Sequence, residues 1–195
     1  PVLIAVTILV LLLTLTATSY ETYFAGAQFV HFLLGPATVA LAVPLYTQFR
    51  RVRSLLLPVL AGLVAGSLTA ALSAIAVARL FGASLPTQLS LAPKSVTTPI
   101  AMGIAERIGG IPSLTAVLVI VTGILGAVGA RYIFDAMKLR DPAIRGFAIG
   151  VASHGIGTAR AFQVSEQAGA FAALAMGLNG ALTALLLPLV LGWMR

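Results

Sequence analysis

Long apolar stretches alternate with shorter polar segments along the whole chain. A helix that crosses a bilayer needs about 20 largely apolar residues. Five stretches approach or exceed this length, and they are Val2–Ala17, Phe32–Tyr46, Leu55–Phe81, Ile111–Phe134 and Ala168–Trp193. The pattern predicts an all-α polytopic membrane protein with about five full spans, of which the first two are short.

The composition of the chain also indicates a protein surrounded by lipid. Hydrophobic residues make up 59% of the chain and charged residues only 9%, and the mean hydropathy is +1.06. A soluble domain normally carries about 25% charged residues. Because so few ionic groups are available for a water-facing surface, we expect the lipid bilayer to surround most of this protein.

Two segments, Pro86–Gly110 and Asp141–Gly169, differ from the spans around them. Each has a short apolar run, a polar centre rich in Gly, Pro, Ser or Thr, and a second short helical run. They are too polar to face lipid and too apolar for aqueous loops. Such backbone occurs at membrane depth only where it is buried in protein or lines a cavity. We interpret both segments as re-entrant hairpins or broken helices.

The basic residues predict the orientation of these segments. Lys and Arg concentrate in cytoplasmic loops of membrane proteins. Two clusters follow the second and fourth spans, and they consist of Arg50, Arg51 and Arg53, and of Arg131, Lys138, Arg140 and Arg145. On this map Pro86–Gly110 enters the membrane from outside and Asp141–Gly169 enters it from inside. Hairpins that enter from opposite faces are typical of a binding site near the midplane.

A shift of 60 residues aligns the two polar segments. Thr98 then falls on Thr158, and Glu106 falls on Glu166. A span plus a re-entrant segment reverses the orientation of the chain, so a duplication of this kind gives an inverted repeat, which is typical of secondary transporters. Chance agreement in a chain so rich in Ala, Leu and Gly is the alternative interpretation.

The centre of the first polar segment has the composition of an anion site. It is bracketed by Pro93 and Pro99, and its polar side chains are Lys94, Ser95, Thr97 and Thr98. The prolines rule out a continuous helix. A half-helix that starts near Ser95 would present free N–H groups and a positive dipole end, to which Lys94 adds a full charge. The alternative is that Lys94 reaches the external headgroups and that the hydroxyls only cap the helix.

The centre of the second segment reads ASHGIGTAR. Its candidate substrate-binding residues are Ser153, His154, Gly155, Gly157, Thr158 and Arg160. The glycines permit a sharp turn and close approach to a ligand. His154 and Arg160 would hold an anion, and His154 would also suit a coupling proton. The alternative is a polar hinge in which His154 bonds a neighbouring carbonyl.

Four further polar residues are candidates. Glu106 and Glu166 would form ion pairs near the interface or bind a coupling cation. Asn179 lies within the last span, where it would bond a hairpin backbone or the substrate. Thr38 follows Gly35 and Pro36, which interrupt the second span, so it would line the site; a simple proline kink is the alternative.

Several function classes find no support in the sequence. The chain has no cysteine, no His and carboxylate spacing for a metal, no nucleophile motif and no P-loop. We therefore expect neither an enzyme nor a cofactor. The net charge of +7 does not indicate nucleic-acid binding, because the charges lie between apolar segments and set topology.

Specific strings in the chain resemble the LrgB/CidB family of bacterial membrane proteins. The resemblance covers nearly the whole chain, and KSVTTPIAM and SHGIGTA are its most specific strings; the matching stretches are 33–46, 91–127, 141–162 and 169–189. It implies that the family's first hydrophobic segment is missing before residue 1. Some relatives have an acid where Gly103 stands, so no role for a charge there carries over.

The resemblance implies two functions. One is an antiholin-like regulator of murein hydrolase activity and cell lysis, acting with a small holin-like partner of the LrgA/CidA type. The other is a transporter of small monocarboxylates such as pyruvate, glycolate and glycerate. Interrupted helices with buried Lys, His and Arg favour transport. We expect residues 1–53 to be a scaffold and residues 54–195 a transport core of an elevator-like homodimer in the bacterial cytoplasmic membrane.

Overall fold

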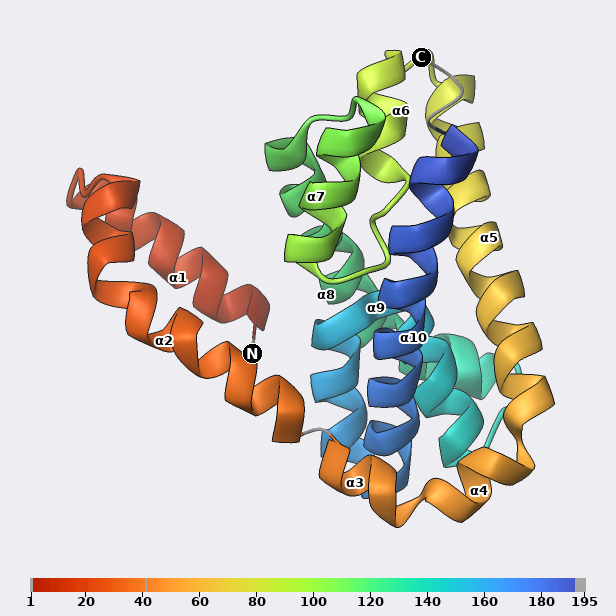
Figure 1. Ribbon diagram of the computed structural model, residues 1–195. Coiled ribbons are helices and arrows are strands. Elements are labelled where there is room, and N and C mark those ends of the chain that lie inside the picture. Colours follow the sequence, from red (N-terminus) through yellow and green to blue (C-terminus); the bar gives the residue numbers. More distant parts are fainter. Residues whose placement is uncertain (1, 41, 192–195) are drawn as a thin grey trace. The chain divides into compact units, whose positions relative to one another are not determined.

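The computed structural model describes residues 2–40 and 42–191, and every regular element in this part of the chain is an α-helix. The helices are α1 (Val2–Leu15), α2 (Tyr20–Ala40), α3 (Ala42–Thr47), α4 (Phe49–Ser54), α5 (Leu56–Leu80), α6 (Leu85–Leu91), α7 (Thr98–Ile108), α8 (Pro112–Ala136), α9 (Pro142–Val164) and α10 (Glu166–Leu191). The chain forms two compact units, Pro1–Val43 and Pro44–Arg195 (Figure 1).

The smaller unit contains α1 and α2. Helix α2 continues through Pro36 to Ala40, so the helix does not end at Gly35 and Pro36, where the sequence predicts an interruption. A proline within a helix removes one backbone hydrogen bond, which neighbouring groups can compensate in a membrane. The side chain of Thr38 and the residue Trp193 lie outside the described residues.

Within the described residues, three helices are long and apolar enough to cross a membrane, namely α5, α8 and α10. They coincide with three of the five predicted spans. Their outer faces carry exposed apolar side chains, for example Leu57 and Leu72 on α5 and Leu125 on α8, as expected for surfaces that contact lipid. Helix α1 has only 14 residues, and the predicted second span falls on α2 and α3, so a count of five spans stays a prediction.

Helices α6 and α7 are the arms of a first hairpin, and the non-helical residues 92–97 form its tip (Figure 1). The last turn of α6 is fixed against the α7–α8 connection, because the Ser90 hydroxyl accepts from the Ile111 amide at 2.7 Å and the Ser90 carbonyl accepts from Thr115 Oγ1 at 3.1 Å. Gly109 ends α7 with φ of 90°, a left-handed conformation that glycine adopts readily. The polar centre bracketed by prolines is therefore the tip of a hairpin.

Helix α9 is a second hairpin. The backbone leaves helical geometry at Ser153 (φ −130°, ψ 15°) and His154 (φ 42°, ψ −134°). In an uninterrupted helix residues 149 and 157 would lie about 12 Å apart along the axis. A Cβ built on Gly157 would instead lie 2.9 Å from the Ile149 carbonyl oxygen. The chain thus turns back at this point, and α9 has a first arm (142–152) and a second arm (155–164), which the sequence predicts.

Glycines on the first arm allow α9 to pack directly on the backbone of α10. A Cβ added at Gly146 would overlap the carbonyl oxygen of Ala168, and one added at Gly150 would overlap that of Ala172. Small residues of this kind allow helices in membranes to approach closely. The position of the second tip therefore depends on α10.

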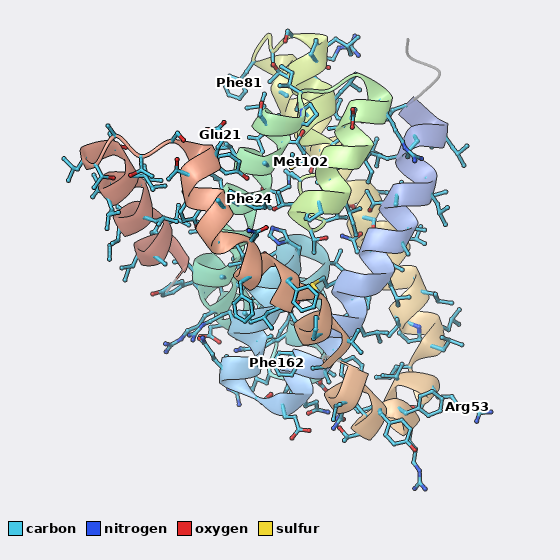
Figure 2. All side chains as sticks on the ribbon, turned by 60° about the vertical axis from the view of Figure 1, so that its left-hand side comes forward. Glu21, Phe24, Arg53, Phe81, Met102 and Phe162 are labelled. Atoms are coloured by element: carbon cyan, nitrogen blue, oxygen red, sulfur yellow. The ribbon has the colours of Figure 1, made fainter. Side chains whose placement is uncertain are left out.

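The two hairpins enter the larger unit from opposite ends. At one end the ion pair of Arg51 with Asp141 (2.8 Å) joins α4 to the start of α9. At the same end the hydrogen bond from Thr47 to Glu166 (3.4 Å) joins α3 to α10. At the other end Leu191 packs in a cluster that includes residues of α6 and α7. Arg53 and Phe81 mark these two ends in Figure 2. The two tips consequently lie between the ends of the unit.

Candidate functional site

Asn179 joins the tips of the two hairpins. It lies in the middle of α10 and is only 1% exposed. Its side-chain nitrogen donates to the Ser95 carbonyl at 3.2 Å and to the Val151 carbonyl at 3.0 Å. Two interruptions that are more than 50 residues apart in sequence are thus held by one amide group. Of the two roles considered for Asn179, the structure shows the bond to the hairpin backbone.

The other side of the Asn179 amide is also occupied. Its oxygen accepts from the hydroxyl of Ser67 on α5 and from that of Thr183 at 3.3 Å. Neither Ser67 nor Thr183 is among the predicted site residues. A hydroxyl one turn after Asn179 on the same helix is a signal that could have identified Thr183.

The first tip contains a buried polar atom without a partner. Ser95 is 6% exposed, and its Oγ has no hydrogen-bond partner among the described residues. Buried polar atoms are nearly always paired, so a buried hydroxyl without a partner calls for an explanation. Lys94 beside it is half-buried and forms no ion pair within the described part of the chain.

Helix α7 begins at the same tip. Its N-cap residue Thr97 has extended geometry and makes no side-chain cap bond to the first turn. The N–H groups of a first helical turn have no partner inside the helix and form the positive end of its dipole. Thr97 and Thr98 are half-buried. The first tip therefore offers a hydroxyl, an ammonium group and amide hydrogens.

The second tip is closed by internal bonds. Ser153, His154 and Thr158 are buried. His154 Nε2 lies 2.9 Å from the Val119 carbonyl oxygen on α8, and Thr158 Oγ1 donates to the His154 carbonyl at 2.8 Å. This is the polar hinge that was the alternative interpretation of His154. The second arm of α9 also starts here, and Gly155 in its first turn is half-buried.

Two glycines of α8 make room for this tip. A Cβ at Gly123 would lie 2.8 Å from His154 Cε1, and one at Gly126 would overlap the Ser153 hydroxyl. Neither was predicted as a site residue. Their spacing of three places both on one face of a helix, which could have identified a surface for close packing.

Three predicted charged residues lie away from the tips. Arg160 is exposed on the second arm of α9, where it donates to Gln163 at 3.0 Å. Glu106 is exposed near the end of α7, and Glu166 is exposed at the start of α10. Since the acids of the larger unit lie elsewhere, the start of α7 and Lys94 give the first tip a positive character.

No three His, Asp or Glu side chains among the described residues come together in a way that could hold a metal ion. The chemistry that the tips can offer is accordingly that of hydrogen-bond donors and positive charge.

Comparison with known proteins places the chain among membrane proteins. A family model described as the LrgB-like family matches residues 1–193. Two uncharacterized proteins of Bacillus subtilis (strain 168) are each 36% identical: YxaC over 97% of this chain and 83% of its own length, and YwbG over 100% and 86%. The antiholin-like protein LrgB of Bacillus cereus (strain B4264) is 30% identical over 97% of this chain and 82% of its own length. No solved structure matches the chain significantly.

Proposed function

Because the chain belongs to the LrgB-like family and three of its described helices are long and apolar enough to cross a membrane, we propose that it is a secondary transporter of small monocarboxylates of the pyruvate, glycolate and glycerate class. The single observation that supports this function best is the buried, unpartnered hydroxyl of Ser95 at the point where the two hairpin tips meet. We interpret this hydroxyl as a hydrogen-bond donor for a bound substrate.

A carboxylate suits the donors around this hydroxyl. In our proposal its oxygens accept from Ser95 Oγ and from the first-turn amides of α7, and Lys94 neutralises the charge. Hydrogen bonds to a charged group contribute about 1.5–3 kcal/mol each, roughly twice as much as neutral ones. Ser153, Gly155, Gly157 and Thr158 would shape the opposite wall, with Asn179 behind both tips.

Transport would follow from movement of the core. Residues 54–195 carry both hairpins, and we propose that they move against residues 1–53 in an elevator-like cycle within a homodimer of the bacterial cytoplasmic membrane. His154 is the candidate for a coupling proton, since it is the one titratable side chain of the second tip in the described part of the chain.

A second candidate function is an antiholin-like regulator that acts with a small holin-like membrane partner. The observation that favours it is the name of the 30% identical relatives in Bacillus cereus. A regulator has no need for an unpartnered donor at membrane depth, where such a group is costly. For this reason we place transport first.

Uptake of labelled pyruvate, glycolate or glycerate into proteoliposomes separates the two functions. We expect the purified chain to accumulate at least one of these acids, and Lys94→Gln to lower the initial rate about tenfold or more, because it removes the positive charge at the tip. Ser95→Ala should weaken uptake in the same direction. Arg160→Ala should have a smaller effect, because Arg160 lies on the arm and not at the tip.

The chain provides matched controls for both substitutions. Lys138→Gln removes the only other lysine, which is exposed, and Ser113→Ala removes an exposed hydroxyl near the start of α8. Both should leave uptake unchanged. If none of the acids enters, with or without the holin-like partner, and lysis control survives Lys94→Gln, the regulatory function replaces transport.

A further inference from the structure

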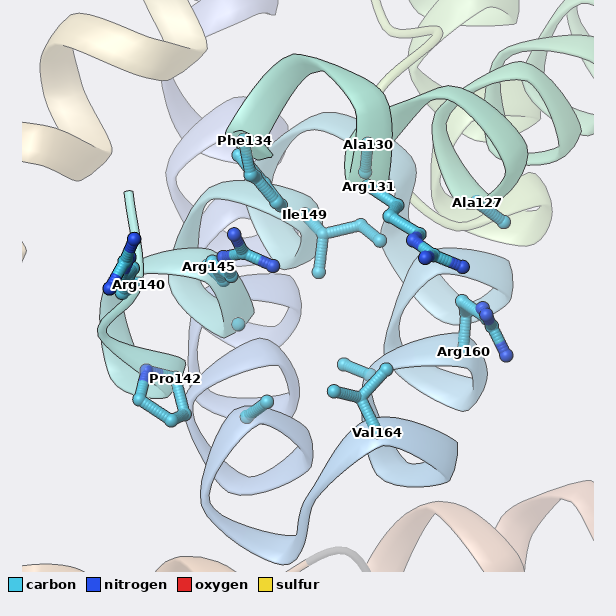
Figure 3. A pocket seen from close by; sticks show the side chains of 13 residues that line it. Ala127, Ala130, Arg131, Phe134, Arg140, Pro142, Arg145, Ile149, Arg160 and Val164 are labelled. Carbon is cyan, nitrogen blue, oxygen red and sulfur yellow. The ribbon is translucent and has the colours of Figure 1, made fainter. Parts of the chain in front are cut away.

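A cavity of about 340 Å³ lies between the two arms of α9 and the last turns of α8. It is separate from the hairpin tips and belongs to the end of the unit that carries the Arg51–Asp141 ion pair. Four arginines line it. Figure 3 shows Arg131 and Arg160 on one side of the cavity and Arg140 and Arg145 on the other.

Only part of this positive charge is neutralised. The Asp135 carboxylate pairs with Arg145 and, at 3.7 Å, with Arg131. The Arg145 guanidinium also lies 5.7 Å from the centre of the Phe134 ring, which fixes it at the cavity wall. Arg140 and Arg160 form no ion pair with any described carboxylate. The cavity therefore has an excess of positive charge and suits an anion.

The remaining walls are apolar. Ala130, Ile149, Ala161 and Ala168 belong to one buried cluster, and Phe134 packs against it. Val164 adds an exposed methyl surface at the second arm. A small hydrophilic acid gains nothing from such walls, whereas an acyl chain buries apolar surface against them. The lining indicates a ligand with a negative head and an apolar body.

The depth of the cavity fits the same ligand. Arg131 lies in the last two turns of α8, which is long enough to cross the bilayer, and Arg140 follows that helix. The basic clusters predict that this end faces the cytoplasm. Basic pockets between membrane helices on the cytoplasmic side suit anionic lipid headgroups. We infer that this cavity binds an acidic phospholipid, with Arg140 and Arg160 on the phosphate and an acyl chain along the apolar wall.

A lipid at this place would join the two arms of α9. Arg140 precedes the first arm and Arg160 belongs to the second, so a phosphate between them links both arms below the tip. The occupant therefore stabilises the hairpin irrespective of whether the protein transports or regulates.

The test measures binding of phosphatidylglycerol to the purified full chain in detergent, by native mass spectrometry and by the shift in thermal unfolding. We expect phosphatidylglycerol, and not phosphatidylcholine, to bind and to raise the unfolding temperature. The double variant Arg140→Gln/Arg160→Gln should bind it about thirtyfold more weakly, because each basic side chain near an anionic lipid contributes about fivefold.

The control is Arg50→Gln/Arg53→Gln, which removes the same charge from exposed positions at the same end and outside the cavity. It should change phosphatidylglycerol binding by no more than about twofold, because charges outside the cavity attract an anionic lipid only through their general electrostatic field. If the double cavity variant folds poorly, the single variants and Val164→Glu, which places a carboxylate on the lining, give the same comparison.

Three results would overturn the assignment. The first is equal binding by the cavity variant and the control variant. The second is equal stabilisation by phosphatidylcholine. The third is displacement of the lipid by inorganic phosphate or glycerol 3-phosphate at millimolar concentration, which would make the cavity a site for soluble anions. Because the readout is lipid binding, failure here leaves the uptake experiment untouched.

Discussion

Alanine at both Gly146 and Gly150 is expected to destabilise the larger unit by about 4 kcal/mol, the largest effect we predict for any pair of single-methyl additions. Each added Cβ would overlap a backbone carbonyl oxygen of α10. A flexible side chain could move aside, but a helical backbone cannot, so α9 must separate from α10. Overpacking of a tight contact costs about 1–3 kcal/mol for each site, and neighbouring sites need not add. Heating in detergent followed by size-exclusion chromatography measures the loss of thermal stability.

The control is the double variant Gly129→Ala/Gly177→Ala. A Cβ at either position meets no atom within 4 Å, and both glycines lie inside helices. Alanine is a better helix former than glycine by about 1 kcal/mol, so this variant should be as stable as the wild type or more stable. Equal tolerance of both double variants would mean that α9 and α10 do not pack through these glycines in the membrane.

The sequence predicts the hairpin tips well because proline and glycine act locally. Pro93 and Pro99 both disfavour a continuous helix, and the tip lies at this pair, although a single proline such as Pro36 leaves α2 continuous. In the second segment the backbone turns at Ser153 and His154, just before Gly155, and the residue with φ of 42° is the histidine. A non-glycine residue in this conformation is strained. Its bond to the Val119 carbonyl, a partner 35 residues away in sequence, helps to hold it.

The positions of the charged residues were harder to predict, because residues that are close in sequence can lie far apart along a helix axis. Arg160 lies six residues after His154, and helical rise carries it about 9 Å from the tip. Glu106 follows Thr98 by eight residues of α7, or about 12 Å, and Glu166 lies beyond the extended residue Ser165 that ends α9. Each therefore lies toward the open end of its hairpin or beyond it. The same rise brings Arg160 into the cavity with Arg131, which no local pattern indicates.

Partners that come from distant helices could not be predicted either. Ser67 and Val119 contact the second tip or the amide that joins the tips. Their choice depends on which faces of α5 and α8 turn inward, and these helices are apolar all round, so periodicity gives no direction. Asn179 is the exception, because a lone amide in an apolar span needs a partner.

Replacement of Asn179 by leucine should break the connection between the two hairpin tips. Asn179→Leu keeps a similar volume but removes both donors, so the Ser95 and Val151 carbonyls lose their side-chain partner. A buried polar group left without a partner costs about 1–3 kcal/mol. We expect a loss of roughly 3 kcal/mol in unfolding free energy, and uptake that falls below the level of Lys94→Gln, because both walls of the proposed site lose their common support.

Two substitutions show whether the donors or the apolar change are responsible. Gln167→Leu makes the same amide-to-leucine change on α10 at a half-buried position near its start, and it should alter stability by about 0.5 kcal/mol or less. Ser67→Ala removes one donor to the Asn179 oxygen and leaves the bonds to both tips in place. It should therefore cost about 1 kcal/mol. If Asn179→Leu proves no more harmful than Ser67→Ala, the two tips do not depend on this amide, and their meeting must have another cause.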